Sequence, residues 1–201
     1  MSENRPTALF TFGCSTHTSD SLVALLRKHR ITAVVDVRSV PFSRFTPHFN
    51  REAIQDSLIR NRIHYLWMGP EFGARREEAE AYREGRVDFS KVFQLEAFQR
   101  GVARLRVGLA KNYRIALMCT EKDPANCHRT IMVTRYLSNV LAWQVAHIHF
   151  DGTVETNATF EARIRALAEV EDDLFTNDPA DLTRQAYQWF EARAAWRGES
   201  R

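Results

Sequence analysis

The sequence has no apolar run of the roughly 18 to 20 residues that a membrane-spanning helix requires, and its first residues lack the apolar core of a signal peptide. Cysteine is also scarce, with three residues in a chain of 201. An odd number of cysteines in a chain without an export signal argues against a disulfide framework. We therefore expect a cytoplasmic protein with free thiols and no membrane contact.

Charge of one sign is not in large excess either, because the formal net charge is +3. Acidic residues collect near the end, at 171–173 and between Asp178 and Asp181, so the rest of the chain is more basic than this total. A partner that carries phosphate, nucleic acid included, is therefore allowed but not required. The hydrophobic content of 44% and the charged content of 26% are ordinary for a globular protein.

Strand-like and helix-like segments alternate through the first 150 residues. This alternation predicts an α/β fold: a three-layer sandwich with a mostly parallel, Rossmann-like central sheet, formed by residues 1–150. Predicted strands lie at 8–12, 32–37, 63–68, 114–118 and 143–148, and predicted helices lie at 19–29, 51–60, 90–110 and 128–139.

The last fifty residues do not continue this alternation. They predict a helix at 160–170, an acidic linker, and a second helix from Asp178 to Trp196. We interpret residues 151–201 as C-terminal helices that pack on the same domain, or against a second subunit in a homodimer. Residues 74–88 are dense in Arg and Glu and predict a solvated excursion with some helix.

A polar residue follows nearly every predicted strand. Ligands of open parallel sheets bind outside the carboxyl ends of the strands, where loops and helix N-termini converge. The order of these residues therefore predicts a site at that edge, although polar loops are ordinary on any surface. They are Ser15 and His17 after the first strand, Asp36 and Arg38 at the second, Glu71 after the third, Cys119 and Glu121 after the fourth, and His147 and His149 at the fifth.

Asp36 is the most unusual of these residues, because it interrupts a run of valines. An unpaired carboxylate buried there would cost several kcal/mol, so Arg38, Arg129 or a ligand must compensate it. Asp36 and Arg38 share one face of their strand, about 7 Å apart along it. The two side chains can therefore serve one site together.

Residues 115–132 carry the clearest chemical pattern. An apolar strand leads into a polar turn, and the Cys-His-Arg triplet at 127–129 then opens a helix. The first turn of such a helix favours an anion, and an arginine there asks for a compensating negative group. In the structural alternative, both cysteines of the segment are buried hydrophobes and Arg129 pairs with Glu121 or Asp123.

Three blocks of residues occur in order along the chain. They are Gly13-Cys14-Ser15-Thr16-His17-Thr18, then Val35-Asp36-Val37-Arg38-Ser39 with Pro41, Ser43 and Arg44, and finally Leu117-Met118-Cys119-Thr120-Glu121 with Asp123-Pro124 and Cys127-His128-Arg129. Over residues 8–150 they resemble the signature blocks of the domain of unknown function 488 family of bacterial proteins. The chain departs from that pattern at Cys14, where the family has His or Tyr. The resemblance implies an α/β domain with a polar, enzyme-like site and specifies no reaction.

Several chemistries are open to the cysteines. Arg129 lies too far from Cys119 and too close to Cys127 for the phosphate loop of a cysteine phosphatase. Cys127 is the better candidate nucleophile, because a helix N-terminus lowers the pKa of a thiol. Zinc binding by Cys119, Cys127, His128 and a further histidine is an alternative, although C-x7-C-H lacks the paired spacing of common zinc sites. A redox pair of the two cysteines is another. No cofactor is indicated, and no metal is assigned.

The interpretation we favour is a hydrolase or transferase that acts on a nucleotide-like or other phosphorylated substrate. Arginine side chains would bind the anion, because a planar guanidinium pairs with phosphate through two hydrogen bonds. A carboxylate or His17 would act as general acid or base. The predicted catalytic residues are Asp36, Glu121, His17 and Cys127, and the predicted binding residues are Ser15, Arg38, Ser43, Arg44, Glu71, Cys119, His128 and Arg129.

A module that binds a nucleotide or a nucleic-acid end without turnover is the alternative function. Phe42, Phe45 and Phe49 could stack on a base, although aromatic residues also anchor ordered loops. Our geometric prediction is that distant residues gather at one rim of the sheet around a shared hollow. They are Asp36, Arg38, Glu121, Cys127 and Arg129.

Overall fold

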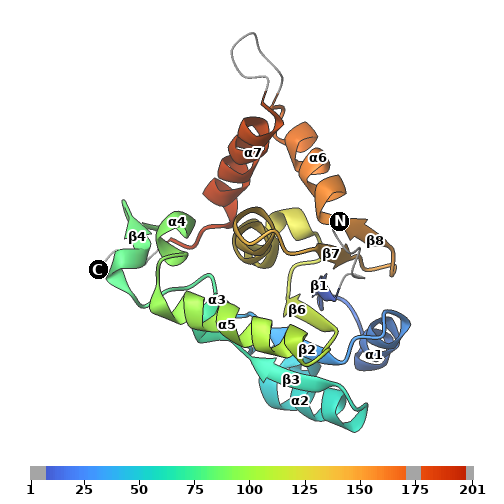
Figure 1. Cartoon of the computed structure of the whole chain (residues 1–201). Helices are drawn as coiled ribbons and strands as arrows, with labels where there is room; N and C mark the ends of the chain where they lie inside the picture. Colours follow the sequence, from blue (N-terminus) through green and yellow to red (C-terminus); the bar gives the residue numbers. More distant parts are fainter. Residues whose placement is uncertain (1–7, 171–177, 198–201) are drawn as a thin grey trace.

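The computed structural model describes residues 8–170 and 178–197, and its centre is a six-stranded sheet with the order β3-β2-β6-β1-β7-β8 (Figure 1). The first five of these strands are parallel and β8 is antiparallel. The strands of this sheet are β1 (Leu9–Gly13), β2 (Ala33–Asp36), β3 (His64–Trp67), β6 (Ile115–Cys119), β7 (Val145–Ile148) and β8 (Val154–Thr156). A separate hairpin pairs β4 (Tyr82–Arg83) with β5 (Arg86–Val87).

Helices connect the strands. The α-helices are α1 (Ser19–Lys28), α2 (Arg51–Arg60), α3 (Gly69–Phe72), α4 (Phe89–Val92), α5 (Glu96–Ala110), α6 (Asn157–Leu167) and α7 (Pro179–Ala194). The short 3-10 segments are η1 (Pro47–Phe49), η2 (Ala79–Ala81) and η3 (Pro124–Asn126). The segments η4 (Arg129–Thr134) and η5 (Tyr136–Val140) are π-helical.

Two hydrophobic layers enclose the sheet. Leu22 and Leu26 of α1 and Ile54 of α2 belong to the cluster on one face. The other face is covered by α5, η4 and the two C-terminal helices, and Phe160 and Tyr187 place α6 and α7 in that same cluster. Every residue of the two central strands β1 and β6 is buried, as a parallel sheet covered on both faces requires. The predicted three-layer α/β fold is therefore confirmed.

The structure departs from the local predictions in four places. The helix predicted at 90–110 is divided into α4 and α5, because Leu95 has an extended backbone (ψ 137°) that interrupts the helical hydrogen bonds. The helix predicted at 128–139 is the wider π-helical pair η4 and η5. The excursion at 74–88 contains a short helix as predicted, η2, but it also holds the unpredicted β4-β5 hairpin, and strand β8 was not predicted.

The residues before α1 and α2 have different side-chain contacts. Thr18 caps α1, and its side chain accepts a hydrogen bond from the backbone N–H of Ser21. The side-chain oxygen of Asn50 does not cap α2, because it accepts a hydrogen bond from the backbone N–H of Ser43. The acidic stretch 171–173 lies outside the described residues. Where the chain is described, none of its helices combines the length and the apolar character needed to cross a bilayer.

Candidate functional site

Strands β1 and β6 lie side by side, and the chain leaves them toward opposite faces of the sheet. The helix α1 that follows β1 packs on one face, and the segment η4 that follows β6 packs on the other. Two backbone hydrogen bonds continue the pairing past the strand ends, from Cys14 N to Cys119 O (2.8 Å) and from Ser15 N to Thr120 O (3.0 Å). In open α/β sheets, ligands bind at such a topological switch point.

Asp36 ends strand β2 and is fully buried in an ion pair with Arg38. Its Oδ1 accepts hydrogen bonds from the backbone N–H of Arg38 (3.1 Å) and from Arg38 Nε (2.9 Å). Its Oδ2 accepts bonds from Arg38 Nη2 (2.6 Å) and from the Tyr65 hydroxyl (2.8 Å). Arg38 Nη2 also donates to the carbonyl of Phe49 (2.8 Å). The predicted compensation of Asp36 by Arg38 is therefore present.

This pairing limits what the two side chains can do. Four donors already use the lone pairs of the Asp36 carboxylate, so it has no free position from which to accept a substrate proton. Burial removes stabilising water from the Arg38 guanidinium, but the Asp36 carboxylate outweighs this and raises the pKa of Arg38. Burial and the same carboxylate raise the pKa of Tyr65. The arrangement suits a structural clamp between β2, β3 and the loop that follows β2.

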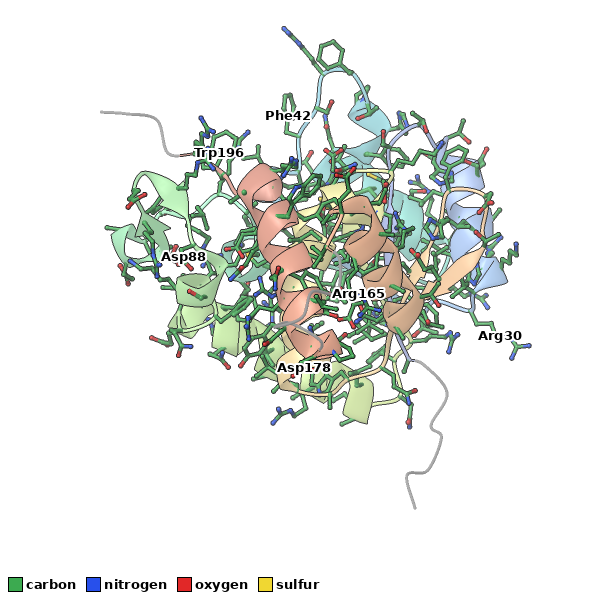
Figure 2. All side chains as sticks on the ribbon, turned by 90° about the horizontal axis from the view of Figure 1, so that it is seen from above. Arg30, Phe42, Asp88, Arg165, Asp178 and Trp196 are labelled. Carbon is green, nitrogen blue, oxygen red and sulfur yellow. The ribbon has the colours of Figure 1, made fainter. Side chains whose placement is uncertain are left out.

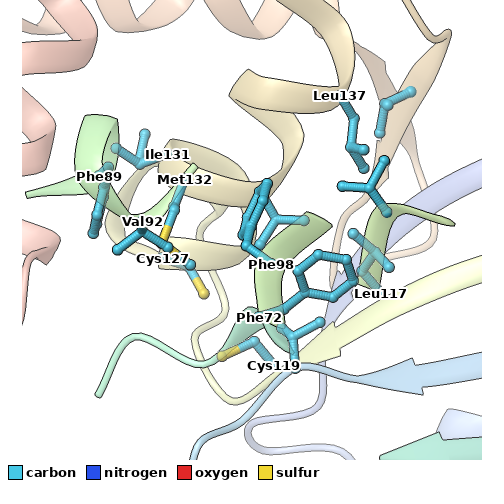
Figure 3. Close-up of a cluster of buried hydrophobic side chains, with 14 of the residues drawn as sticks. Phe72, Phe89, Val92, Phe98, Leu117, Cys119, Cys127, Ile131, Met132 and Leu137 are labelled. Carbon is cyan, nitrogen blue, oxygen red and sulfur yellow. The ribbon is translucent and has the colours of Figure 1, made fainter. Parts of the chain in front are cut away.

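Cys119, Cys127 and His128 form a second buried cluster next to this clamp. Cys119 ends β6, and the loop from Thr120 to Asn126 returns the chain so that the ligand atoms of the three residues lie within 4.8 Å of one another. Figure 3 shows the two sulfur atoms turned toward one another at the edge of the hydrophobic cluster. His128 Nδ1 lies 3.8 Å from Cys119 Sγ, and its Nε2 lies 3.0 Å from the carbonyl oxygen of Val37.

The two thiols of this cluster are not equivalent. Burial raises the pKa of Cys127, but the Cys119 thiol, Arg129 and His128 outweigh it and hold that pKa well below its ordinary value. The interaction with Cys127, and then burial, raises the pKa of Cys119. Burial lowers the pKa of His128, yet contact with Cys127 reverses this and leaves the pKa raised. The third thiol, Cys14, is buried on the other face of the sheet, and burial raises its pKa to about 11.

Among the residues that the structure describes, Arg129 is the largest fully buried side chain, and its guanidinium has one hydrogen bond, from Nη1 to the carbonyl oxygen of Glu121 (2.6 Å). Its Nε and Nη2 atoms have no partner among the residues that the structure describes. The predicted pairing of Arg129 with the carboxylate of Glu121 or Asp123 is absent from this part of the chain, because the Glu121 side chain is exposed and Asp123 caps η3 and contacts Arg163. A buried cation with unused donors is costly unless an anion reaches it.

His17 lies on the other side of the switch point, in the loop between β1 and α1. Its ring stacks on Phe150 with centroids 4.3 Å apart, and its Nδ1 is 3.2 Å from Ser21 Oγ. Within the described ranges its buried Nε2 has no partner. Burial, and then the charge of Lys122, lowers the pKa of His17, so the ring is neutral at pH 7 and its chemistry is that of a base.

Most of the remaining predicted residues make contacts within the loops around the site. Glu71 is buried in an ion pair with Arg104, and Ser43 Oγ accepts backbone hydrogen bonds from Phe45 and Thr46. Ser15 is half-buried beside β6. The exposed Arg44 lies over the ring of Phe45, 5.0 Å from its centroid.

Two hollows open near this edge of the sheet, and the residues that line them differ from those predicted to share one. One, of about 620 Å³, is lined by Lys122, Phe150 and Arg163 among others, and a second, of about 550 Å³, includes Ser39 and Trp67. Neither is lined by any of the five residues that we expected to face a common opening. Those residues lie around the ends of β2 and β6, but Asp36, Arg38, Cys127 and Arg129 are buried there and Glu121 points to solvent.

Three residues of this region, in two groups, were not predicted from the sequence. Tyr65 reaches Asp36 from the neighbouring strand, and Lys122 and Phe150 pack beside His17, with Lys122 Nζ 4.4 Å from the Phe150 ring centroid. The first depends on the register that pairs Asp36 with Trp67, and the second on the proximity of the loops after β6 and β7. Neither relationship leaves a signal in the local sequence.

Comparison with known proteins gives one match. Neither the curated proteins nor the solved structures that were searched contain a match to this chain. A family model, described as domain of unknown function DUF488, matches residues 18–137. The match spans more than half of the chain and includes the Asp36-Arg38 clamp and the Cys119, Cys127 and His128 cluster. The chain therefore belongs to the DUF488 family.

Proposed function

We propose that this protein is a hydrolase or transferase that takes a nucleotide-like or other phosphorylated substrate at the switch point between β1 and β6. The observation that carries the proposal is the Arg129 guanidinium. It is fully buried, has no carboxylate partner in the described chain, and keeps two nitrogen atoms without hydrogen bonds. A planar guanidinium with free donors matches the oxygens of a phosphate group.

The neighbouring loops supply the other requirements of a transfer reaction. His17, with its unpartnered Nε2 and lowered pKa, is the general base in this proposal, because Asp36 has no free lone pair. The loop that carries Glu121 lies between Arg129 and His17. The backbone oxygen of Glu121 accepts a hydrogen bond from Arg129, and the next residue, Lys122, contacts Phe150, on which His17 stacks. Movement of this loop would admit the substrate.

The same proposal places the chemistry in the cytoplasm, in keeping with three free cysteines. It assigns the partner as a small anionic molecule. A nucleic-acid end remains the alternative ligand, and the exposed Phe42 and Phe45 in the loop after β2 are the observation that favours it. Figure 2 shows the loop around Phe42 projecting from the body of the protein.

Ligand binding tests the proposal directly. Thermal unfolding of the full chain would be followed with inorganic phosphate, nucleoside mono-, di- and triphosphates, sugar phosphates and short oligonucleotides, because a ligand that binds only the folded state raises the melting temperature. Arg129→Gln should abolish the shift given by the best phosphorylated ligand. Arg76→Gln is the matched control, because Arg76 is also buried but is paired with Glu78.

Arg129→Lys keeps the charge and serves if the Gln variant does not fold. It should bind the same ligand more weakly, because an ammonium cannot form the two parallel bonds of a guanidinium. Turnover of the bound ligand then separates enzyme from binding module. His17→Ala should lose turnover and keep affinity, whereas His29→Ala, at the other end of α1, should keep both. Equal ligand shifts in wild type and folded Arg129 variants would contradict the proposal.

A further inference from the structure

Three atoms that can bind a metal ion converge beside the switch point. They are the sulfurs of Cys119 and Cys127 and the Nδ1 atom of His128, and all lie within 4.8 Å of one another. A tetrahedral zinc ion with Zn–S bonds of about 2.3 Å and a Zn–N bond of about 2.0 Å holds its ligand atoms roughly 3.5 to 3.8 Å apart. The 3.8 Å between Cys119 Sγ and His128 Nδ1 is only slightly longer than the sulfur–nitrogen spacing of about 3.5 Å.

The orientation of His128 gives an independent reason. Its Nε2 faces the carbonyl oxygen of Val37 at 3.0 Å, and a carbonyl can only accept a hydrogen bond. Nε2 must therefore carry the proton, which leaves the lone pair of a neutral ring on Nδ1, directed at the sulfurs. A metal-bound histidine typically donates its other N–H to a carbonyl or carboxylate in this way, which fixes the tautomer and the ring orientation.

The backbone around the three residues is held in place before any metal arrives. Cys119 is the last residue of the buried strand β6, and Cys127 and His128 directly precede η4. The loop between them is shaped by η3, where the Asp123 side chain accepts a hydrogen bond from the N–H of Ala125 (3.0 Å). The seven-residue return of this loop explains why C-x7-C-H brings its ligands together without the short paired spacing of common zinc motifs.

We propose that Cys119, Cys127 and His128 bind a zinc ion through two thiolates and one imidazole, with a fourth coordination position left open. Two sulfurs and one nitrogen are a donor set that suits zinc, and three protein ligands with one open position are typical of catalytic rather than structural zinc sites. The described chain brings no fourth His, Cys, Asp or Glu ligand into the group. Zinc with two thiolates is neutral, so Arg129 next in sequence keeps its need for an anion.

Two competing roles for the cluster predict different behaviour. A redox pair would join Cys119 to Cys127 as a disulfide and would give His128 no part in it. A thiolate nucleophile would use Cys127 and would not need Cys119 as a partner. The zinc site uses all three residues, and it goes beyond the proposed function because metal binding does not depend on the phosphate site.

Metal content is the first test. The untagged full chain would be purified without chelators or metal-affinity resin, equilibrated with a small molar excess of zinc and passed through a desalting column, and zinc and protein would then be quantified. We expect equimolar zinc in the wild type. Cys119→Ser and Cys127→Ser should lose it, while the matched control Cys14→Ser should retain it, because the Cys14 sulfur lies on the opposite face of the sheet.

Cobalt substitution of the wild-type chain keeps the test decisive if the serine variants do not fold. Cobalt bound by two thiolates gives an intense near-ultraviolet charge-transfer band, and visible bands of tetrahedral strength, that zinc displaces. Absence of these bands, substoichiometric zinc in the wild type, or equal loss of zinc from Cys14→Ser would overturn the proposal, and a Cys119–Cys127 disulfide in the isolated protein would favour the redox pair. Because no phosphorylated ligand is used, failure here leaves the phosphate-binding proposal intact, and the reverse also holds.

Discussion

The Nε2 atom of His128 lies 3.0 Å from the carbonyl oxygen of Val37, the residue that follows Asp36. This hydrogen bond joins two segments 91 positions apart in the sequence. It fastens the cysteine and histidine cluster at the end of β6 to the Asp36-Arg38 clamp at the end of β2. A substitution in either group should therefore alter the position of the other group at the same edge of the sheet.

Removing the charge of Asp36 should destabilise the fold strongly. Asp36→Asn leaves the buried Arg38 guanidinium without its counter-charge, and breaking one partner of a buried pair costs about 3 to 5 kcal/mol in the free energy of unfolding. Tyr65→Phe removes only one hydrogen bond and should cost about 1 kcal/mol. Urea unfolding measures both. Glu96→Gln, which breaks the exposed pair with Arg100, is the control and should leave the midpoint unchanged. A shift for Asp36→Asn no larger than that for Tyr65→Phe would contradict the clamp.

Stability should fall in acid because His147 is buried in its neutral form. Burial, and then the charge of Arg129, lowers the pKa of His147 to about 3, below the unfolded value of about 6.5. The unfolded chain then binds a proton that the folded chain does not, so stability is lost as pH falls from about 6.5 toward about 3. From pH 6.5 to pH 5 this loss amounts to about 2 kcal/mol.

The free energy of unfolding at several pH values isolates this contribution. Below pH 6.5, His147→Gln should reduce the slope of the free energy of unfolding against pH by the contribution of about one bound proton, whatever its effect on absolute stability. Identical slopes in wild type and His147→Gln would show that His147 does not carry the effect.

Gly13 should tolerate no side chain, because the loop after β6 passes directly over it. A Cβ atom at this position would lie 2.0 Å from the backbone oxygen of Glu121, the oxygen that accepts the hydrogen bond from Arg129. Gly13→Ala should therefore cost about 1 to 3 kcal/mol of stability and displace the loop that holds Arg129. Gly108→Ala is the comparison, since its Cβ would meet only the flexible end of Ile115, and it should be near neutral in denaturant unfolding. Equal effects of the two changes would contradict this prediction.

Phe42 and Phe45 should contribute to recognition of a base and not to stability. Their side chains are 70% and 82% exposed. Phe42→Ala combined with Phe45→Ala should leave the melting temperature unchanged and weaken nucleotide binding about tenfold or more, because stacking of a base contributes about 1 to 3 kcal/mol. Calorimetric titration with a nucleotide and with inorganic phosphate separates the base from the phosphate.

Phosphate affinity should be the same in this double variant and in the wild type. Val140→Ala changes another exposed apolar side chain, on η5, and should alter neither titration. If the double variant keeps full nucleotide affinity, the loop has no role in base recognition.

Local sequence predicted the main elements well, because their signals are local. The apolar runs around Leu9 and Ile115 and the helical spacing of Leu22 and Leu26 depend only on neighbouring residues. The prediction failed where the outcome depends on packing between distant segments. The π-helical path through η4 and the break before α5 belong to this class. In each, a backbone hydrogen bond changes its partner by one residue or is lost, and the spacing of apolar residues along the sequence does not indicate such a change.

The features of the candidate site also fall into those that the local sequence predicts and those that depend on packing between distant segments. The order of residues along the chain is enough to show which polar residues follow which strand, and Asp36 within its valine run already required a partner. The three-dimensional packing was needed to show that Arg38 and Tyr65 both satisfy Asp36, that Arg129 keeps two nitrogens without a partner in the described residues, and that the loop before Cys127 returns it to Cys119. The reason is that the types of side chain and the order of the strands along the sequence can be read directly from it. The register of the strands and the path of the loops depend on the burial of the whole core.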